Sequence, residues 1–310
     1  MNQIAENTPD KELLMRKAIL SWNPLIELKN TVILPGGSNS TAVRAGETVY
    51  RFPQTKEAFA AMRQEANLTK VLRDSLSETF RSKIAEVFIV DQSKDILSAF
   101  SYHRYIPGKI MDNRRGETEF NTCYAHLNLE RQDRLARETA AFLAELHSVP
   151  LKAFQKISIQ AGQDWDFTNR INIEYCRELL LKHSHNRIDL NDFKMNCSRD
   201  FVFCHNDLSG SNILIDPEKE SILTGIIDFA NAGFYPRTNE FVPLYKIGRD
   251  FVCRIVKYYN RFSNVSVDMR ETDYKLLCFI CFLLEKQKKP SFFITALIED
   301  FIQSYFTQRT

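Results

Sequence analysis

The first hundred residues consist of short apolar runs separated by turn residues such as Gly46. The β-like runs occupy residues 31–34, 43–44, 49–52, 85–90 and 96–105. Residues 57–72 instead repeat their apolar positions at the spacing of one helical face. Another helix is expected over residues 11–28, with a break near Pro24. The pattern therefore predicts a small β-sheet accompanied by helices.

The pattern becomes helical after Ile-Pro-Gly at residues 106–108. Apolar positions in residues 135–147 recur with a period of 3.6 residues. Three further aromatic-rich helices are expected over residues 251–262, 274–287 and 291–306. A chain of 310 residues is long enough for two lobes with a sizeable core. We therefore expect two domains, a nucleotide-binding lobe over residues 1–104 and a catalytic and substrate-binding lobe over residues 105–310.

Composition narrows the class of protein. Lys plus Arg total 41 and Asp plus Glu total 39, so the charge balance gives no reason to expect binding to nucleic acid or to a membrane surface. The longest apolar run, residues 276–284, is far shorter than the ~20 residues of a membrane span. Seven scattered cysteines do not form a disulfide framework, and the polar N-terminus lacks the layout of a secretion signal. We expect a cytoplasmic monomer.

One stretch indicates a specific chemistry. Residues 202–216 place Asp207 and Asn212 between two apolar runs, and Asp228 stands sixteen residues beyond Asn212, followed by Phe229. Phosphoryl transfer from a nucleotide needs one carboxylate to orient a hydroxyl nucleophile, and an amide oxygen with a second carboxylate to hold magnesium. The alternative is that Asp207 and Asp228 only cap turns. The length of the complete pattern favours phosphoryl transfer.

With these residues the chain resembles the aminoglycoside phosphotransferase and choline kinase superfamily, which are small-molecule kinases. The resemblance extends from about residue 32 to residue 241 and rests on residues 34–41, 49–53, 142–147, 205–216 and 226–229, together with Glu65. The segment ending at His147 is most similar to 2″-type aminoglycoside kinases, whereas the glycine-rich loop and Arg51 are more similar to bacterial choline kinases. The resemblance implies an α+β, protein-kinase-like, two-lobed fold, with a small β-rich N-lobe and a larger, mostly helical C-lobe.

The resemblance also implies roles for the loop residues. Asp207 would be the base or orienter of the acceptor hydroxyl, and Asn212 and Asp228 would be Mg²⁺ ligands. His205 would brace the loop through hydrogen bonds rather than act as a base. Asn231 and Glu240 stand where Asp would be usual. Glu240 can do the same bracing work, whereas Asn231 puts an acid-rich substrate site in doubt.

The predicted nucleotide-binding residues lie in the first hundred or so residues. They are Gly36, Gly37, Ser38, Asn39, Arg51, Glu65, Tyr105 and Ile106. Glycines allow backbone N–H groups to approach a phosphate, although Gly36 and Gly37 alone are equally typical of a hairpin turn. Arg51 replaces the family's commoner Lys and would pair with Glu65. The alternative for this pair is two solvated charges.

These features predict a kinase that transfers the γ-phosphoryl group of ATP or GTP to a hydroxyl of a small molecule, similar to an aminoglycoside phosphotransferase. The alternatives are a choline, amino-alcohol or sugar kinase, or a nucleotide-binding pseudokinase with little activity, since Arg is not equivalent to Lys. A protein kinase is disfavoured because no Ala-Pro-Glu-like motif follows Asp228. Residues 231–310 hold 8 acidic and 12 basic residues with many aromatic ones, so composition does not choose the acceptor.

Overall fold

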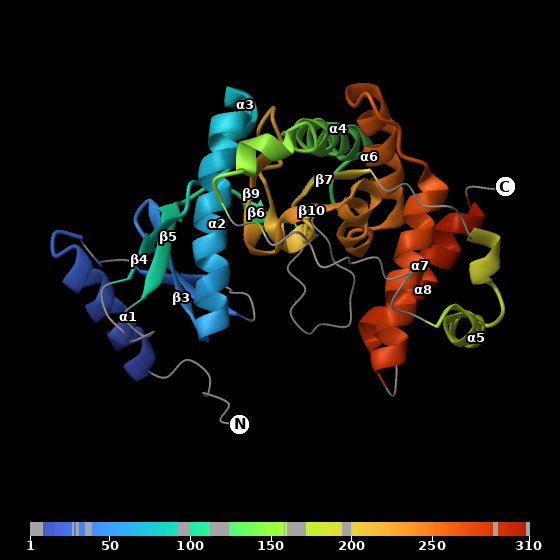
Figure 1. Ribbon diagram of the computed structural model, residues 1–310, viewed down its shortest axis with the longest axis horizontal. Coiled ribbons are helices and arrows are strands. Elements are labelled where there is room, and N and C mark those ends of the chain that lie inside the picture. Colours follow the sequence, from blue (N-terminus) through green and yellow to red (C-terminus); the bar gives the residue numbers. More distant parts are fainter. Residues whose placement is uncertain are drawn as a thin grey trace. The chain divides into compact units, whose positions relative to one another are not determined.

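In the computed structural model, the chain forms two compact units (Figure 1). It describes residues 9–26, 28, 31–34, 39–91, 99–111, 124–157, 159, 172–193, 200–287 and 291–307. The first unit comprises Met1–Asp74 with Ile84–Ile106, and the second comprises Ser75–Lys83 with Pro107–Thr310. The assignment of a nucleotide-binding role to one lobe and a catalytic role to the other stays a prediction.

The first unit contains a five-stranded antiparallel sheet. Its strands lie in the order β1 (Val32–Leu34), β2 (Ser40–Ala45), β3 (Thr48–Pro53), β5 (Phe100–Arg104) and β4 (Phe88–Val90). A tight turn joins β2 to β3, and Gly46 in this turn has φ +59°, a conformation that glycine adopts without a steric cost. The predicted β-rich region is therefore present, with short strands in place of the longer runs expected over residues 85–90 and 96–105.

Two helices cover opposite faces of this sheet (Figure 1). On one face, Met15 and Ile19 of α1 (Pro9–Trp22) form a core with Tyr50 and Phe52 of β3. Because successive strand residues point to opposite faces, the intervening Arg51 points to the other face, where it meets α2 (Lys56–Ser75). The helix expected over residues 11–28 ends earlier, at Trp22.

The second unit is mostly helical and carries two small antiparallel sheets. Its helices are α3 (Glu78–Arg81), α4 (Leu129–Leu146), α5 (Ile173–His183), α6 (Arg249–Phe262), α7 (Met269–Lys286) and α8 (Phe292–Thr307). One sheet pairs β7 (Phe201–Cys204) with β10 (Gly233–Pro236), and the other has the order β6 (Lys109–Ile110), β8 (Ile213–Ile215), β9 (Leu223–Ile226). None of the helices among the described residues is long and apolar enough to cross a membrane.

Capping and amphipathicity explain the helices of the second unit. The side chain of Asn128 accepts a hydrogen bond from the Arg131 N–H at the start of α4, and Asp268 does the same for the Arg270 N–H at the start of α7. The apolar face of α4, including Phe142, is buried, and α4 packs against α6. These elements agree with the helices expected over residues 135–147, 251–262, 274–287 and 291–306.

Candidate functional site

The candidate site is built on the loop of residues 205–212, which connects β7 to β8. The apolar residues Val202, Phe203 and Cys204 anchor β7 in the interior, so that the polar residues begin where the strand ends. The loop closes with a 3₁₀ turn, η5 (Gly210–Asn212), and its last carbonyl oxygen, that of Asn212, accepts the Ile227 N–H at 3.1 Å. This bond ties the loop to the segment that carries Asp228.

His205 is fully buried, and both of its ring nitrogens are used by the backbone. Nε2 donates to the carbonyl oxygen of Ile227 at 3.0 Å, and Nδ1 accepts the N–H of Asp207 at 3.3 Å. Burial lowers the pKa of His205, so the ring is held neutral with its proton on Nε2. These contacts are those of a residue that braces the loop.

The Asp207 carboxylate lies beside an amide and a cation. Nδ2 of Asn231 donates to Asp207 Oδ2 at 3.4 Å. Burial raises the pKa of Asp207, while the His205 ring and the positive charge of Lys246 act in the opposite direction. The sequence marks Asn231 only as a departure from the family pattern, and no sequence signal points to Lys246.

Asn212 ends the 205–212 loop, and Asp228 lies in the segment that is hydrogen-bonded to it. Nδ2 of Asn212 donates to the backbone oxygen of Asp207 at 2.8 Å, which fixes the amide and directs its Oδ1 the other way. Asp228 directly follows the segment tied to Asn212, has φ +68°, and begins the turn η6 (Phe229–Asn231). Its charge raises the pKa of Asp207, as expected for two neighbouring carboxylates. The structure thus brings together His205, Asp207, Asn212 and Asp228.

The Glu240 carboxylate binds the backbone of the 205–212 loop. It lies in η7 (Arg237–Phe241), is fully buried, and its carboxylate accepts the N–H groups of His205 at 2.6 Å and Asn206 at 3.3 Å. Burial raises the pKa of Glu240 to about 8, against the opposing effect of these N–H donors and the Cys204 thiol. Asn206 itself has φ +62°, so Glu240 binds the loop at a backbone position that few residue types adopt.

The first unit contains the predicted Arg51–Glu65 ion pair. Nη1 of Arg51 lies 2.6 Å from Oε2 of Glu65, and the two side chains are 14% and 2% exposed. The alternative of two solvated charges is therefore wrong. Such a pair fixes the direction of the guanidinium.

The other predicted nucleotide-binding residues are partly described. The N–H of Tyr105 donates to the Glu47 carbonyl oxygen at 2.7 Å, and the Arg44 guanidinium lies over the Tyr105 ring. Ile106 is buried, and the carbonyl oxygen of Asn39 accepts the Gln54 N–H. Gly36, Gly37 and Ser38 lie outside the described residues.

Comparison with known proteins adds a family and a fold. A model of the "Phosphotransferase enzyme family" matches residues 31–273. The GDP complex of aminoglycoside 2'-phosphotransferase-IIIa is 19% identical, with 96% of this chain and 99% of that chain covered and a TM-score of 0.67. The streptomycin–ATP–APH(2")-IIa complex is 18% identical, with 95% and 97% covered and a TM-score of 0.59. Macrolide 2'-phosphotransferase type I is 15% identical, with 96% and 98% covered and a TM-score of 0.58. These similarities confirm the expected kinase-like α+β fold.

Proposed function

Because the chain belongs to the phosphotransferase enzyme family, as its resemblance predicted, we propose that it is a small-molecule kinase. It would transfer the γ-phosphoryl group of ATP or GTP to a hydroxyl group of its acceptor. The observation that carries the proposal is the convergence of Asp207, Asn212 and Asp228 on the 205–212 loop. Positioning and charge neutralisation would lower the barrier, without a covalent enzyme intermediate.

We assign to Asp207 the role of orienting the acceptor hydroxyl group and taking its proton. Its Oδ2 receives the Asn231 amide, so Oδ1 is the oxygen assigned to the hydroxyl proton. Burial raises the pKa of Asp207, which makes the carboxylate a better proton acceptor than an exposed one. His205 is neutral and engaged by the backbone on both nitrogens, so it supports the loop and takes no proton from the acceptor.

Asn212 and Asp228 fit a magnesium site in their chemistry. An amide oxygen and a carboxylate are the hard oxygen ligands that Mg²⁺ takes in proteins. The bond from Asn212 Nδ2 to the Asp207 carbonyl oxygen supports this assignment, because it orients the amide oxygen away from the backbone. When bound, the ion would neutralise negative charge on the phosphates.

Arg51 is assigned to the phosphates of the nucleotide. Its bond to Glu65 orients the guanidinium, and a guanidinium can bind phosphate through two parallel hydrogen bonds. The residue differs from Lys in length and shape, so the alternative of a nucleotide-binding pseudokinase stays open to test. Gly36, Gly37, Ser38 and Asn39 are assigned to the phosphates on the resemblance alone.

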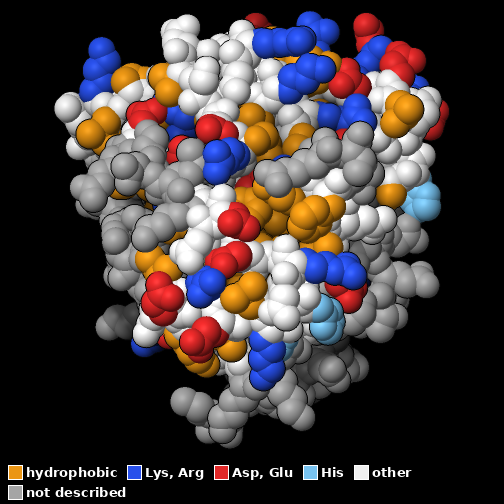
Figure 2. Space-filling model, turned by 90° about the vertical axis from the view of Figure 1, so that its right-hand side faces the viewer, with side chains coloured by type: hydrophobic (Ala, Val, Ile, Leu, Met, Phe, Trp, Pro, Cys, Tyr) orange, Lys and Arg blue, Asp and Glu red, His pale blue; other side chains and the backbone are white. Residues whose placement is uncertain are grey.

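The acceptor is proposed to be an aminoglycoside-like molecule. Several solved relatives in fold are complexes with kanamycin, streptomycin or gentamicin. One observation favours the alternative of an uncharged acceptor such as a sugar: the positive charge of Lys246 acts on Asp207, and Asn231 contributes no negative charge beside it. Basic and acidic side chains are intermixed on the face drawn in Figure 2.

The deciding experiment measures release of ADP or GDP with Mg²⁺ against a panel of aminoglycosides, macrolides, choline, ethanolamine and sugars. We expect turnover with at least one acceptor, its loss in Asp207→Ala, and nucleotide binding in that variant by thermal shift. Asp216→Asn, which changes a carboxylate at the far end of β8, is the matched control and should keep wild-type turnover. Normal turnover in Asp207→Ala would refute the assignment, and nucleotide binding without turnover on any acceptor would support the pseudokinase.

A further inference from the structure

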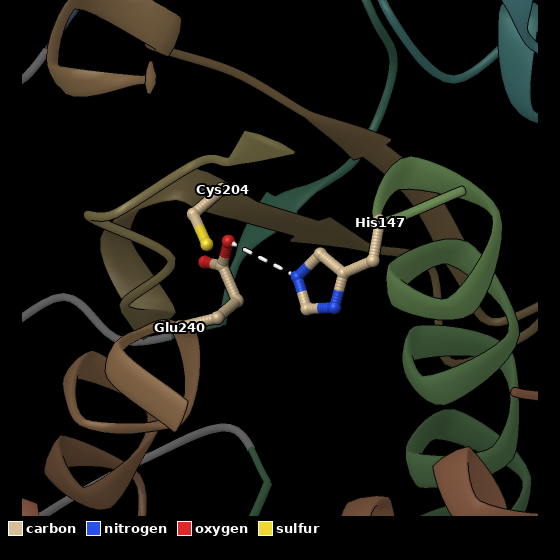
Figure 3. Close-up of side chains that lie close together, drawn as sticks. All are labelled: His147, Cys204 and Glu240. Atoms are coloured by element: carbon tan, nitrogen blue, oxygen red, sulfur yellow. Dashed lines mark ion pairs between the residues drawn. The ribbon is translucent and has the colours of Figure 1, made fainter. Parts of the chain in front are cut away.

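Three buried side chains lie close together (Figure 3), and one of them, Glu240, binds the backbone of the 205–212 loop. His147 caps the C-terminus of α4, Cys204 ends β7, and Glu240 lies in η7. Their ligand-type atoms all lie within 4.8 Å of one another. Nε2 of His147 points to Oε2 of Glu240 at 3.7 Å, longer than a hydrogen bond, and has no hydrogen-bond partner among the described residues.

These are side-chain types that bind zinc, but their protons favour a different interpretation. Burial raises the pKa of the Cys204 thiol well above its ordinary value, whereas a thiol must lose its proton to bind a metal. Both carboxylate oxygens of Glu240 already accept backbone N–H groups, those of His205 and Asn206. The cluster is therefore better explained by the group that lies behind His147.

Behind His147 lie Tyr259 and Arg237. The Tyr259 hydroxyl is 2.9 Å from Nδ1 of His147 and receives a hydrogen bond from Nη1 of Arg237, whose guanidinium also binds Asp200 at 2.7 Å. An arginine only donates, so the hydroxyl's own proton remains to be given to Nδ1. Burial and the charge of Arg237 lower the pKa of His147 to about 3, so the ring is neutral. A neutral ring that accepts at Nδ1 carries its proton on Nε2.

The ionised form of Glu240 favours the same proton position on the ring. If Nε2 carried a lone pair instead, it would face the carboxylate at 3.7 Å and the two would repel. With the proton on Nε2, the N–H dipole points its positive end at Glu240. Two independent contacts of His147, one on each nitrogen, thus select the same tautomer.

We propose that His147 and Tyr259 are positioning residues, which link the charge of Arg237 to Glu240, favour the ionised form of its carboxylate and direct it at the 205–212 loop. The proposal rests on the proposed kinase function, since that loop carries Asp207. An ionised carboxylate makes stronger hydrogen bonds to the N–H groups of His205 and Asn206 than a neutral carboxyl group does.

The charge of Glu240 is sensitive to its surroundings because its pKa lies near neutrality, at about 8. The groups that face it are the Cys204 thiol from β7, the Asp207 charge from the loop, His147 from α4, and Arg237 through Tyr259 of α6. Asp207 and burial disfavour the ionised form. The N–H dipole of His147, oriented by Tyr259, favours it.

The first test does not need turnover. Full-length protein labelled with ¹⁵N-histidine is examined by long-range ¹H–¹⁵N NMR, and His147→Gln identifies the signals of His147. We expect an unprotonated Nδ1 and a protonated Nε2 that do not change between pH 6 and 8. A proton on Nδ1, or an imidazolium in that range, would overturn the proposal whether or not the protein is a kinase.

The second test removes only the Tyr259 hydroxyl. With Mg·ATP or Mg·GTP and water as acceptor, we expect Tyr259→Phe to lower kcat about tenfold at pH 7, with the nucleotide KM unchanged. The acid limb of kcat should move to higher pH, and amide hydrogen exchange at His205 and Asn206 should be faster. Tyr258→Phe is the matched control, because Tyr258 is next in sequence but bonds Asp133 instead, and it should resemble wild type.

Variants of His147 separate positioning from packing. His147→Gln can still present an N–H group to Glu240, whereas His147→Leu cannot. We expect most of the activity and of the exchange protection to be kept in the first and lost in the second. Equal losses in both variants, or wild-type exchange and pH profile in Tyr259→Phe, would overturn the proposal. If the wild-type protein shows no turnover, the kinase function fails, while the exchange and NMR results still decide the positioning role.

Discussion

The Arg51–Glu65 pair should contribute to the free energy of unfolding through the coupling of its two charges rather than through either residue alone. The test is a double-mutant cycle with Arg51→Met, Glu65→Leu and the double variant. The two side chains are 14% and 2% exposed, so each single variant leaves one charge in a site with little water. The double variant removes both charges and keeps apolar bulk at both positions.

The exposures predict unequal losses of the free energy of unfolding. Arg51→Met deprives the 2%-exposed Glu65 of this guanidinium and should cost about 3–4 kcal/mol. Glu65→Leu leaves the guanidinium of Arg51, which at 14% exposed can still reach water, and should cost about 1–2 kcal/mol. The double variant should lie within about 1 kcal/mol of wild type, because an apolar pair can replace an ion pair of similar volume. The single losses total about 4–6 kcal/mol, so the coupling is then at least about 3 kcal/mol.

The assay is urea unfolding followed by the fluorescence of Trp22, which packs against Phe100 and Tyr102 of the same sheet. Trp165 is replaced by Phe in every variant, so that the signal reports on the first unit alone. A coupling below about 0.5 kcal/mol, the value typical of an exposed pair, would refute the reasoning. The same would follow if the double variant lost the sum of the two single losses.

Three further outcomes are expected. Gly108→Ala should lower the thermal midpoint, at a cost of about 1–3 kcal/mol, because a Cβ there would clash with Thr224 Oγ1. Adding Thr224→Ala should restore part of the loss, and no restoration would contradict the clash. The pKa of Glu240 is raised to about 8, so its favourable contribution is complete below its unfolded pKa of about 4.5 and is lost as pH rises through 8; Glu240→Gln should therefore show a flatter dependence of unfolding free energy on pH across that range, measured by urea titration. Iodoacetamide should label the half-buried Cys253 before the buried Cys204, whose thiol pKa is raised, as read by peptide mass spectrometry; the reverse order would contradict this.

Much of the helical fold could be predicted because its helices are amphipathic over several turns. The apolar period of residues 57–72 and 135–147 corresponds to the buried faces of α2 and α4. The helix α5 was not expected. It buries only a narrow face, at Cys176 and Leu180, and its start is set by the cap of Asn172, which the periodicity does not show.

The residue types of the candidate site could also be predicted, and the resemblance implied that His205 and Glu240 brace the loop, but the geometry of the supporting contacts could not be predicted. Asp207 and Asn212 are five residues apart, so their spacing is visible in the sequence. The contact of Asn231 with Asp207 and the bracing of the loop by Glu240 depend on β7 and β10 lying side by side. Strand pairing of this kind joins distant segments, and a single sequence without a hairpin turn does not specify it.

Two backbone positions of the site have φ above zero, Asn206 at +62° and Asp228 at +68°. Asn and Asp adopt this conformation more readily than most residues, but it persists only where the surroundings hold it. At Asn206, the carboxylate of Glu240 binds the N–H group. Beside Asp228, Ile227 is held on both sides, by the His205 ring at its carbonyl oxygen and by the Asn212 carbonyl at its N–H group.

The motif residues and the backbone conformation of the loop that carries them thus depend on different parts of the sequence. Asp207, Asn212 and Asp228 are the residues proposed to provide the oxygen atoms that phosphoryl transfer requires. Glu240 holds the backbone of the loop that carries two of them, and it lies far from that loop in the sequence. A chain that kept the three motif residues but lost Glu240 would match the pattern equally well, although its loop would lack the two hydrogen bonds from the His205 and Asn206 N–H groups. In this chain, the shape of the loop therefore depends on a buried carboxylate that the motif does not contain.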